Sequence, residues 1–428
     1  MRKPTLQITG LLTLLFVSFV PAKAQPITIR TMAGNNDPGS IDGNGSRARF
    51  NHPLGITADN SGNVYVADTE NGTIRKIDSA GLVTTLAGEA GNFGSSDGFA
   101  TSAHFFGPQG IAADTVGNVY VSDSANGTVR KISVGQMVTT LAGSVLNFNS
   151  LDGLGTNAYF YRPAGIAVDT VGNVYIADAW NHNIRKITPA GLTSSLAGLA
   201  GNPGSVDSTN SKARFNQPRG IAIDTATNLF VADSLNHTIR KISPDGNVTA
   251  IAGMPGVWGN TDGTNRNARF FHPQGIAVVG TNTLFVSDSG NELIRKLSLS
   301  GTNWIVSTVA GSRGTPGKQN GTGSIARFSS PHDLASDNLG NLYVADMGNH
   351  LIRSTRIVPP TLQILRAGPL VTIFWPQSAD DFVLESSSTI DPEGVWTAIA
   401  NGISNQGDDF AVTNATIQTA SYYRLRWQ

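Results

Sequence analysis

Residues 163–187, PAGIAVDTVGNVYIADAWNHNIRKI, show the sequence pattern from which the fold can be predicted. Two short apolar runs, residues 165–169 and 174–178, flank the turn sequence Val-Gly-Asn. Gly and Asn between apolar runs of this length predict two antiparallel β-strands joined by a tight turn. Residues 183–187 and 192–198 have the pattern of two further strands with more polar side chains. The stretch and its continuation therefore predict a four-stranded unit.

This unit occurs six times along the chain, with a period of 55 residues in every interval except the last, which is 58. Each copy has a proline, a phenylalanine three residues before it and an alanine five residues before it. The prolines are Pro53, Pro108, Pro163, Pro218, Pro273 and Pro331. A repeat in register indicates one structural unit packed against copies of itself.

Polarity rises from the first strand of each copy to the fourth, and the first strand carries small residues such as Gly165 and Ala167. This gradient fits a wedge-shaped blade whose first strand lies at a crowded inner axis and whose fourth strand faces solvent. We therefore predict an all-β fold, a six-bladed β-propeller of four-stranded blades, over residues 25–358.

The sixth copy lacks a fourth strand of its own. Residues 29–34, IRTMAG, match the fourth-strand sequence VTTLAG at residues 138–143. We expect this N-terminal segment to be the outer strand of the last blade. Such pairing closes the ring without a covalent link and removes open sheet edges.

The run Pro-x-Gly-Ile-Ala-x-Asp-x-x-Gly-Asn-x-Tyr-x-Ala-Asp-x-x-Asn-x-x-Ile-Arg-Lys-Ile at residues 163–187 resembles the NHL repeat, and the resemblance extends to all six copies. Two copies depart from it: Val279 replaces an aspartate that the other copies share, and Asp333 replaces the first-strand glycine. The resemblance implies a six-bladed propeller. It does not imply one activity, because NHL relatives include pure binding modules and some metal-dependent enzymes.

Residues 1–24 have the form of a secretory signal peptide. Arg2 and Lys3 precede an apolar run, and Ala22-Lys23-Ala24 is a cleavage signal. We therefore expect a bacterial chain that is secreted or lies in the periplasm or cell envelope. At the other end, residues 361–428 lack the repeat and contain six short strand-like runs. These runs predict a small β-sandwich of the immunoglobulin-like or fibronectin-like kind.

The composition excludes several classes of protein. Thirty basic and thirty acidic residues give zero net charge, and loss of the leader would leave about −3. This balance argues against a nucleic-acid partner. The chain has no cysteine, so it has no disulfide, no lipid anchor on Cys and no Cys nucleophile. After the leader, no stretch approaches the ~18 apolar residues of a membrane span. The sequence has no P-loop, HExxH or Gly-x-Ser-x-Gly motif. We expect the protein to be a monomer.

Alternating strand direction places the long connections between copies on one face of the ring, together with the loops between second and third strands. Connections this long usually have a role beyond joining strands. The residue after each repeat proline should lie near the pore mouth on this face, and it varies although its surroundings repeat. These residues are Leu54, Gln109, Ala164, Arg219, Gln274 and His332.

We predict a ligand site built on Gln109, Arg219, Gln274 and His332, with Arg162 nearby. The alternative is random drift at positions that face solvent. The planar guanidinium of Arg219 would suit a carboxylate or a phosphate. Trp180 and Trp258 interrupt the repeat pattern on the same face, and we predict that they are exposed aromatic anchors for binding.

Other repeated residues are interpreted as structural. Asp42 and its equivalents are expected to cap backbone N–H groups of a turn, and the Asp68 and Arg75 series are expected to belong to the blade pattern. Phe50 and its equivalents are expected to wedge between blades. His182, His237 and His350 follow an asparagine in a loop between strands, and this Asn-His pair is interpreted as structural.

The candidate donors for a metal are few. A zinc site needs about three protein ligands, and the mouth positions offer one histidine and no carboxylate, so His52 and His272 would have to join His332. Calcium prefers six to eight oxygens, which the Asp42 series does not supply. We therefore predict no cofactor, although calcium or zinc would be the metals to consider.

The sequence favours a secreted, non-catalytic binding or scaffold protein that uses the face with the long loops to bind a protein, peptide or glycan. The alternative is a metal-dependent lyase or a lactonase-type hydrolase with its site at the central pore.

Overall fold

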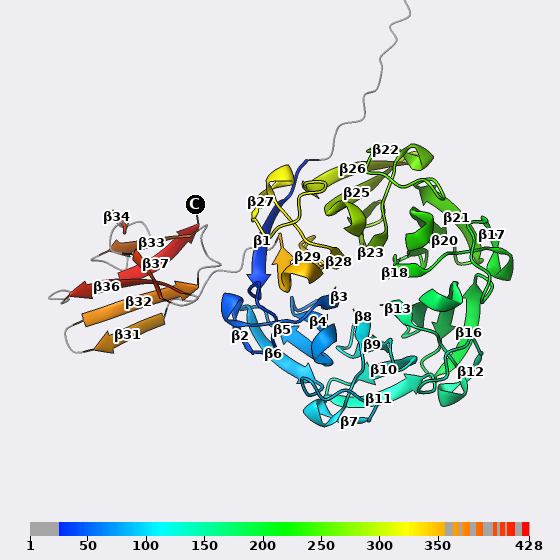
Figure 1. The fold of residues 1–428 in the computed structure, drawn as a ribbon, viewed down its shortest axis with the longest axis horizontal. Coiled ribbons are helices and arrows are strands. Elements are labelled where there is room, and N and C mark those ends of the chain that lie inside the picture. The colour runs from blue at the N-terminus through cyan, green and yellow to red at the C-terminus, as the bar shows by residue number, and fades with distance from the viewer. Residues whose placement is uncertain are drawn as a thin grey trace, which may run out of the picture.

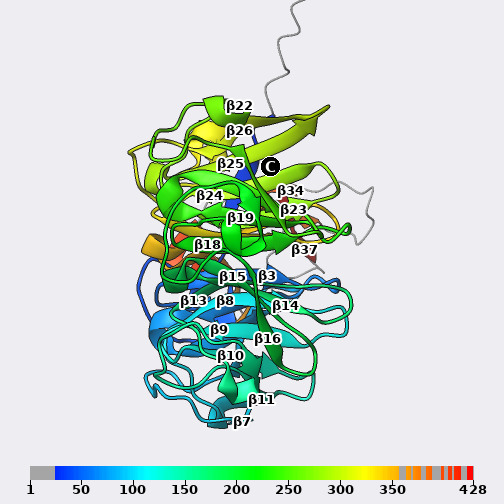
Figure 2. The ribbon, with the colours of Figure 1, turned by 90° about the vertical axis from the view of Figure 1, so that its right-hand side faces the viewer.

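The computed structural model describes residues 25–355 and, in the C-terminal tail, residues 363–367, 370–376, 382–387, 397–399, 403–406, 409–415 and 422–427. The predicted leader, residues 1–24, lies outside the described residues. Between residues 25 and 355 the chain forms six antiparallel sheets of five strands each. Figure 1 shows these sheets around a common centre, and Figure 2 shows the same ring from the side. The prediction of an all-β fold of repeated sheets is confirmed.

The first strand of each repeat lies at the end of its sheet that faces the centre of the ring (Figure 1). These inner strands, which number the sheets 1 to 6, are β3 (Pro53–Ala58), β8 (Pro108–Ala113), β13 (Pro163–Val168), β18 (Pro218–Ile223), β23 (Pro273–Val279) and β28 (Pro331–Ser336). The second strands follow: β4 (Val64–Asp68), β9 (Val119–Asp123), β14 (Val174–Asp178), β19 (Leu229–Asp233), β24 (Thr283–Asp288) and β29 (Leu342–Asp346). All five residues of β14 are buried because neighbouring sheets cover both faces.

The third strands are β5 (Thr73–Ile77), β10 (Thr128–Ile132), β15 (Asn183–Ile187), β20 (Thr238–Ile242), β25 (Leu293–Ser300) and β30 (Leu351–Ser354). The fourth strands are β6 (Leu82–Ala87), β11 (Met137–Ala142), β16 (Leu192–Ala197), β21 (Asn247–Ala252), β26 (Asn303–Gly311) and, in sheet 6, β1 (Thr28–Ala33). In β16, buried and exposed side chains alternate over the first three residues, as expected for a strand with one wet face.

Each sheet carries a fifth strand of two residues, so the prediction of four-stranded blades is wrong by one strand. These strands are β2 (Gly43–Asn44), β7 (Gly98–Phe99), β12 (Gly153–Leu154), β17 (Ser208–Thr209), β22 (Gly263–Thr264) and β27 (Gly321–Thr322). They belong to the long connections and pair with the outer fourth strands, for example Gly43 with Val83. Two residues are too few to show an alternating pattern in the sequence.

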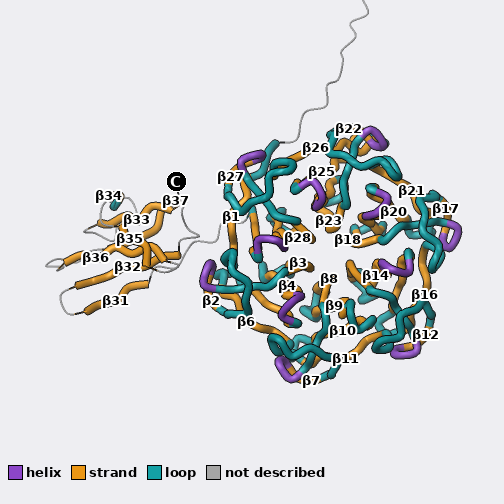
Figure 3. The backbone as a smooth tube through the Cα atoms, viewed as in Figure 1, coloured by secondary structure: helices purple, strands orange, loops and turns teal. Residues whose placement is uncertain are grey.

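Single turns of 3-10 helix mark the connections (Figure 3). One set follows the two-residue strands: η1 (Gly45–Arg47), η3 (Ala100–Ser102), η4 (Gly155–Asn157), η6 (Asn210–Lys212), η8 (Asn265–Asn267) and η10 (Gly323–Ile325). The other set joins second to third strands: η2 (Thr69–Asn71), η5 (Ala179–Asn181), η7 (Ser234–Asn236), η9 (Ser289–Asn291) and η11 (Met347–Asn349).

The N-terminal strand completes sheet 6, as predicted. In β1, Arg30 pairs with Ser354 of β30, and Thr28 pairs with Thr322 of β27. Ile29 of this strand is fully buried. The first described segment of the chain therefore belongs to the same sheet as the last repeat.

The core consists of apolar clusters that lie between neighbouring sheets. One cluster joins Phe50 and Val66, from the first repeat, to Tyr343 and Ile352 of sheet 6. Phe50 and its equivalents in the other repeats are all fully buried. These phenylalanines therefore act as wedges between sheets, as expected, and they link the sheets into one ring.

The described segments of the tail form two antiparallel sheets. One has the strand order β31 (Gln363–Ala367), β32 (Leu370–Pro376), β36 (Asp409–Ala415) and β35 (Ile403–Gln406). The other has the order β34 (Thr397–Ala398), β33 (Phe382–Ser387) and β37 (Tyr422–Trp427). The sequence analysis missed β35, whose residues ISNQ lack an apolar alternation. The immunoglobulin-like assignment of residues 361–428 stays a prediction.

Across the described residues, no helix has the length and apolar character that crossing a bilayer would require.

Candidate functional site

The long connections and the loops between second and third strands emerge on the same side of the ring, because consecutive strands in each sheet are antiparallel. We call this side the long-loop face. The connection from β6 to β8 includes β7 and η3 and is far longer than the turns on the opposite side. The repeat holds these long segments in place by one recurring set of polar contacts.

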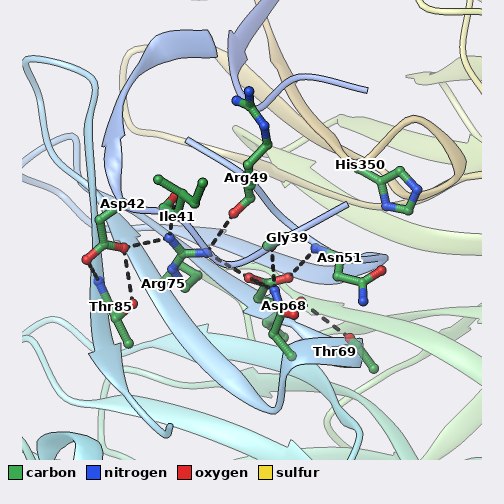
Figure 4. Close-up of polar contacts among 12 residues, drawn as sticks. Gly39, Ile41, Asp42, Arg49, Asn51, Asp68, Thr69, Arg75, Thr85 and His350 are labelled. Atoms are coloured by element: carbon green, nitrogen blue, oxygen red, sulfur yellow. Dashed lines mark hydrogen bonds and ion pairs between the residues drawn. The ribbon is translucent and has the colours of Figure 1, made fainter. Parts of the chain in front are cut away.

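A buried arginine fastens each long connection to its sheet (Figure 4). Arg75, fully buried in β5, forms ion pairs with Asp68 at 2.7 Å and with Asp42 at 2.6 Å. Its two terminal nitrogens also donate to the backbone carbonyls of Arg49 and Ile41 in the connection. The guanidinium carbon lies 5.2 Å from the centre of the Phe50 ring. One side chain thus ties two separate parts of the loop to the sheet.

The same arrangement recurs in every sheet, around Arg130, Arg185, Arg240, Arg295 and Arg353. In sheet 6 the outer carboxylate is replaced by the amide of Asn320, whose oxygen accepts from Arg353 at 3.1 Å. The structural interpretation of the Asp68 and Arg75 series agrees with these contacts.

The role of the Asp42 series differs in detail from the turn cap that the sequence suggested. The Asp42 carboxylate accepts from the backbone N–H of Thr85 at 3.0 Å and from its hydroxyl at 3.1 Å. Asp42 therefore bonds to the fourth strand and to Arg75, not to its own turn. Pairing across 43 residues has no local sequence signal.

The Asn-His pairs join neighbouring sheets. The Nδ1 atom of His182 accepts from the backbone N–H of Gln217 at 3.0 Å, and that of His350 accepts from His52 at 3.1 Å. His237 and His272 form the same contact at 3.3 Å. The histidines at this position have φ angles of 57–59°, where the left-handed backbone positions the ring over the next sheet. Their interpretation as structural fits this geometry.

The inner strands approach one another closely around the axis. A Cβ atom on Gly55 would overlap the carbonyl oxygen of Gln109, and one on Gly165 would overlap that of Arg219. The first-strand glycines are therefore needed for close approach between sheets. The channel that remains is narrow: about 20 Å³ is open to the centre of a water molecule, which is room for little more than one water.

Four of the five residues of the predicted ligand site line this channel, Gln109, Arg219, Gln274 and His332, and so does the mouth residue Ala164. Arg162 does not. Its side chain is exposed, and its guanidinium lies 5.9 Å from the centre of the Trp180 ring.

The expectation of a mouth without a carboxylate is wrong, because Asp333 also lines the channel. Its oxygens accept from the backbone N–H groups of Ile56 at 3.3 Å and Leu334 at 2.9 Å. The substitution of Asp333 for the repeat glycine was visible in the sequence. Asp333 lies one residue after the position that follows the repeat proline. The sequence pattern therefore did not predict that it lines the channel.

Burial perturbs the ionisable groups of the channel. It raises the pKa of Asp333 to about 7, against the effect of the two backbone donors. Burial, with a smaller contribution from Arg219, lowers the pKa of His332 to about 3, so this imidazole is neutral at pH 7. Burial and then the charge of Arg162 lower the pKa of Arg219. Carboxylates and cations with such shifts are typical of binding and catalytic sites.

Exposed aromatic side chains lie in clusters on the long-loop face. The sheet 3 cluster consists of Phe148, Tyr161 and Trp180, with ring centres 5.4 and 5.2 Å apart along the series. The sheet 5 cluster consists of Trp258, Phe271 and His272, with ring centres 5.0 and 4.7 Å apart. Trp180 and Trp258 are 44% and 57% exposed. The two predicted anchors therefore lie on the surface, each in contact with a second ring.

A third aromatic pair, Phe93 with Phe106, has ring centres 5.7 Å apart, and its side chains are 47% and 46% exposed. The sequence analysis missed this pair and the partners of the two tryptophans. Phe93, Phe148 and Trp258 are spaced at multiples of the 55-residue period, as are Phe106, Tyr161 and Phe271. That coincidence was the signal that could have revealed the pairs.

The donors available for a metal do not converge. The His52 ring lies 4.5 Å from His350, and the His272 ring lies 4.9 Å from His237. Of the described histidines and carboxylates, His332 and Asp333 are the ones that line the channel. In the part of the chain that the structure describes, no group of three or more His, Asp or Glu side chains is placed to hold a metal ion.

The fold and the site together define a repeat propeller with a water-sized central channel. The NHL repeat family matches residues 50–77, 160–187 and 328–353. NHL repeat-containing protein 2 of Bos taurus is 30% identical over 307 residues, which cover 63% of this chain and 42% of that protein. The chain spans less than half the length of the curated relatives that it matches first.

Solved structures share the fold. A protein of unknown function from Bacteroides thetaiotaomicron is 22% identical and has a TM-score of 0.59, with 77% of this chain and 76% of that chain covered. An auxiliary nutrient binding protein from the same organism is 16% identical, with a TM-score of 0.58 and the same shares covered. Together with the repeat matches, these neighbours support an NHL-type β-propeller.

Proposed function

We propose that this chain is a secreted, six-bladed NHL propeller that binds a macromolecular ligand, a protein, peptide or glycan, on its long-loop face without catalysing a reaction. The observation that carries the proposal is the set of exposed aromatic rings on the long-loop face. Phe93, Phe106, Phe148, Trp180 and Trp258 are each 40–57% exposed. Aromatic side chains dominate the binding energy of protein interfaces, because they bury a large area at a small cost in conformational entropy.

The dimensions of the channel support a macromolecular ligand over a small one. A site that encloses a small molecule has a volume of several hundred Å³. In the central channel, about 20 Å³ is open to the centre of a water molecule. A ligand must therefore lie across the mouth and can insert only a small group into it.

The repeat contacts explain how such a surface can vary while the fold is retained. The Arg75-type networks hold the loops from below, so the loop surface contributes little to folding. The residues that face outward can differ from sheet to sheet, as Trp258 and its equivalents do: Pro38, Phe93, Phe148, Pro203 and Pro316.

A binding screen tests the proposal. The chain from Gln25 onward is applied to peptide and glycan arrays, and hits are measured in solution by titration. The double variant W180A/W258A should weaken binding by 10-fold or more, at ~1–2 kcal/mol for each aromatic anchor. Binding that is unchanged in this variant would exclude the long-loop face as the binding surface.

A matched control lies on the opposite face. Val171 and Leu339 are exposed apolar residues in the turns between first and second strands. The double variant V171S/L339S removes apolar surface there and should bind as the wild type does.

The alternative, a metal-dependent lyase or lactonase-type hydrolase, draws support from one observation: Asp333, with its pKa raised to about 7, lies beside His332 in the channel. Metal titration of the wild type and of H332A tests it. One tightly bound zinc or calcium per chain, lost in H332A, would favour the enzyme over the binding protein.

A further inference from the structure

We propose that Arg219 binds a carboxylate group of a protein or peptide ligand at the channel mouth. This inference rests on the proposed function of the long-loop face and names the chemistry that its centre recognises.

Arg219 is a cation without a counter-ion. It follows Pro218 at the start of β18, is half-buried, and lines the channel. Among the described residues, its guanidinium has no hydrogen-bond or ion-pair partner within bonding distance. The repeat arginine of the same sheet differs sharply: Arg240 forms ion pairs with Asp207 and Asp233 at 2.7 and 2.8 Å. Withdrawing an unpaired cation from water is unfavourable, and an anion from a ligand would offset that cost.

Polar groups next to Arg219 are also unpartnered. The Oε1 atom of Gln274 and the Nδ1 atom of His332 are buried without a hydrogen bond. The amide nitrogen of Gln274 has only a long contact, 3.5 Å, to Ser234 Oγ. Because nearly all buried polar groups in folded proteins are bonded, these atoms point to a missing partner. Both of these atoms are acceptors in the neutral side chains, so they lack a donor. A carboxylate beside Arg219 could itself accept from the Gln274 amide nitrogen.

The acidic group of the channel does not fill this role. Both Asp333 oxygens accept from backbone N–H groups, and no ion pair joins Asp333 to Arg219 in the described chain. Positive charge instead accumulates around Arg219. The Arg162 charge is close enough to lower the pKa of Arg219, and Arg219 in turn lowers the pKa of His272.

The size of the channel selects the kind of anion. A planar carboxylate on a methylene stem fits a water-sized opening and matches the fork of a guanidinium. A uronic acid carries its carboxylate directly on a ring, which is much larger than the space of about 20 Å³ in the channel. A tetrahedral phosphate is bulkier than a planar carboxylate.

The surroundings favour a protein as the bearer of this group. Arg219 of sheet 4 lies between Arg162, which contacts the sheet 3 cluster, and His272, which belongs to the sheet 5 cluster. A chain across the mouth could place a carboxylate at Arg219 and apolar side chains on both clusters. The carboxylate could come from an Asp or Glu side chain or from a C-terminus.

The test follows the side-chain Nε–H resonance of Arg219 by nuclear magnetic resonance in the chain from Gln25 onward, with the resonance assigned by its loss in R219K. The probes are N-acetylglycine, which mimics a C-terminus, and N-acetylglutamic acid α-amide, which mimics an acidic side chain. We expect a saturable shift with at least one probe, and the stronger response identifies the source. N-acetylglycinamide, the neutral matched probe, should give none.

Two variants complete the test. R214Q changes a neighbouring arginine that bonds only to backbone carbonyls of Ser211 and Ala213, and it should bind both probes as the wild type does. R219Q should bind neither. Because it removes an unpaired half-buried charge, R219Q should also unfold at the same temperature as the wild type or higher, which shows that lost binding is not lost folding.

Several results would overturn the inference. It fails if no acidic probe shifts the Arg219 resonance, or if the neutral probe shifts it equally. It also fails if glucuronate or inorganic phosphate binds more tightly than both acidic probes, in favour of an acidic glycan or a general anion site. If a ligand from the arrays loses affinity in W180A/W258A and keeps it in R219Q, the proposed function stands and only the carboxylate site is wrong.

Discussion

The Asp333 carboxylate in β28 accepts a hydrogen bond from the backbone N–H of Ile56 in β3, with 3.3 Å between Oδ2 and N. This bond crosses the boundary between the last sheet and the first, at the inner edge of the ring. Farther from the axis, within sheet 6, β1 pairs with β30 and so joins the N-terminal segment to the last repeat. The two ends of the repeat array are therefore in contact both at the inner edge of the ring and toward its outer edge.

The first prediction concerns the proton of Asp333. Its pKa of about 7 in the folded protein lies above the ordinary value of 3.8, so the folded state holds the proton more tightly than the unfolded state. The stabilisation is fully present below pH 4 and is lost as the pH rises through about 7. D333N does not titrate. It should gain stability over the wild type between pH 4 and pH 7, by on the order of 1–3 kcal/mol, and keep that gain above pH 7.

Urea unfolding of both proteins at about pH 4.5, 6 and 8 checks this prediction. A stability difference that does not change with pH would mean that Asp333 has an ordinary pKa in the folded protein.

The second prediction concerns the inner glycines. In G220A the new methyl group would overlap the carbonyl oxygen of Gln274 in the next sheet, and because Gly220 has no positive φ, this overlap and not backbone strain causes the destabilisation. We expect a loss of ~1–3 kcal/mol in unfolding free energy. In G135A, the matched control, the nearest heavy atom outside the chain neighbours would be 3.8 Å away, and the change should stay within about 0.5 kcal/mol. Equal effects in thermal unfolding would contradict the close approach of the inner strands.

The third prediction separates the two carboxylates of the Arg75 network. Asp68 is fully buried, whereas the Asp42 side chain is 47% exposed. D68A leaves the Arg75 charge buried without its inner partner and should cost ~3–5 kcal/mol. In D42A, water can take the place of the exposed carboxylate beside Arg75. This variant should therefore cost about 1 kcal/mol. Denaturant unfolding of both variants measures the difference, and an equal or reversed order would be incompatible with the geometry in Figure 4.

The fourth prediction concerns the seam. A chain that starts at residue 34 lacks β1, exposes the edge of β30 and loses the buried Ile29. We expect a lower unfolding temperature and a tendency to associate through the free edge. A synthetic peptide of residues 25–34 should restore much of the lost stability when added in excess, because it binds only the folded chain. If the shortened chain unfolds at the wild-type temperature, β1 contributes nothing to the ring.

Much of the fold could be predicted from single copies of the repeat. The second and third strands, 174–178 and 183–187, have the predicted bounds in the structure. For the second strand the reason is burial on both faces, which requires a nearly unbroken apolar run. The two-residue outer strands could not be predicted in this way, since their pairing depends on a connection that folds back over the next sheet.

The candidate site was predicted in part for a related reason. Gln109, Arg219, Gln274 and His332 hold the same position in different copies, so the repeat period alone placed them around one axis. Their shared position is a property of the sequence, because copies in register must present equivalent residues at equivalent places.

Which of these groups have partners could not be predicted before the sheets were placed against one another. That Arg219 lacks a counter-ion, that Asp333 enters the channel and bonds to Ile56, and that Arg162 lies over Trp180 all depend on contacts between different sheets. The repeat, its register and the residues at the mouth can be read from the order of amino acids alone. Their charge balance and burial depend on how closely six inner strands approach an axis, and that distance is set by packing between sheets.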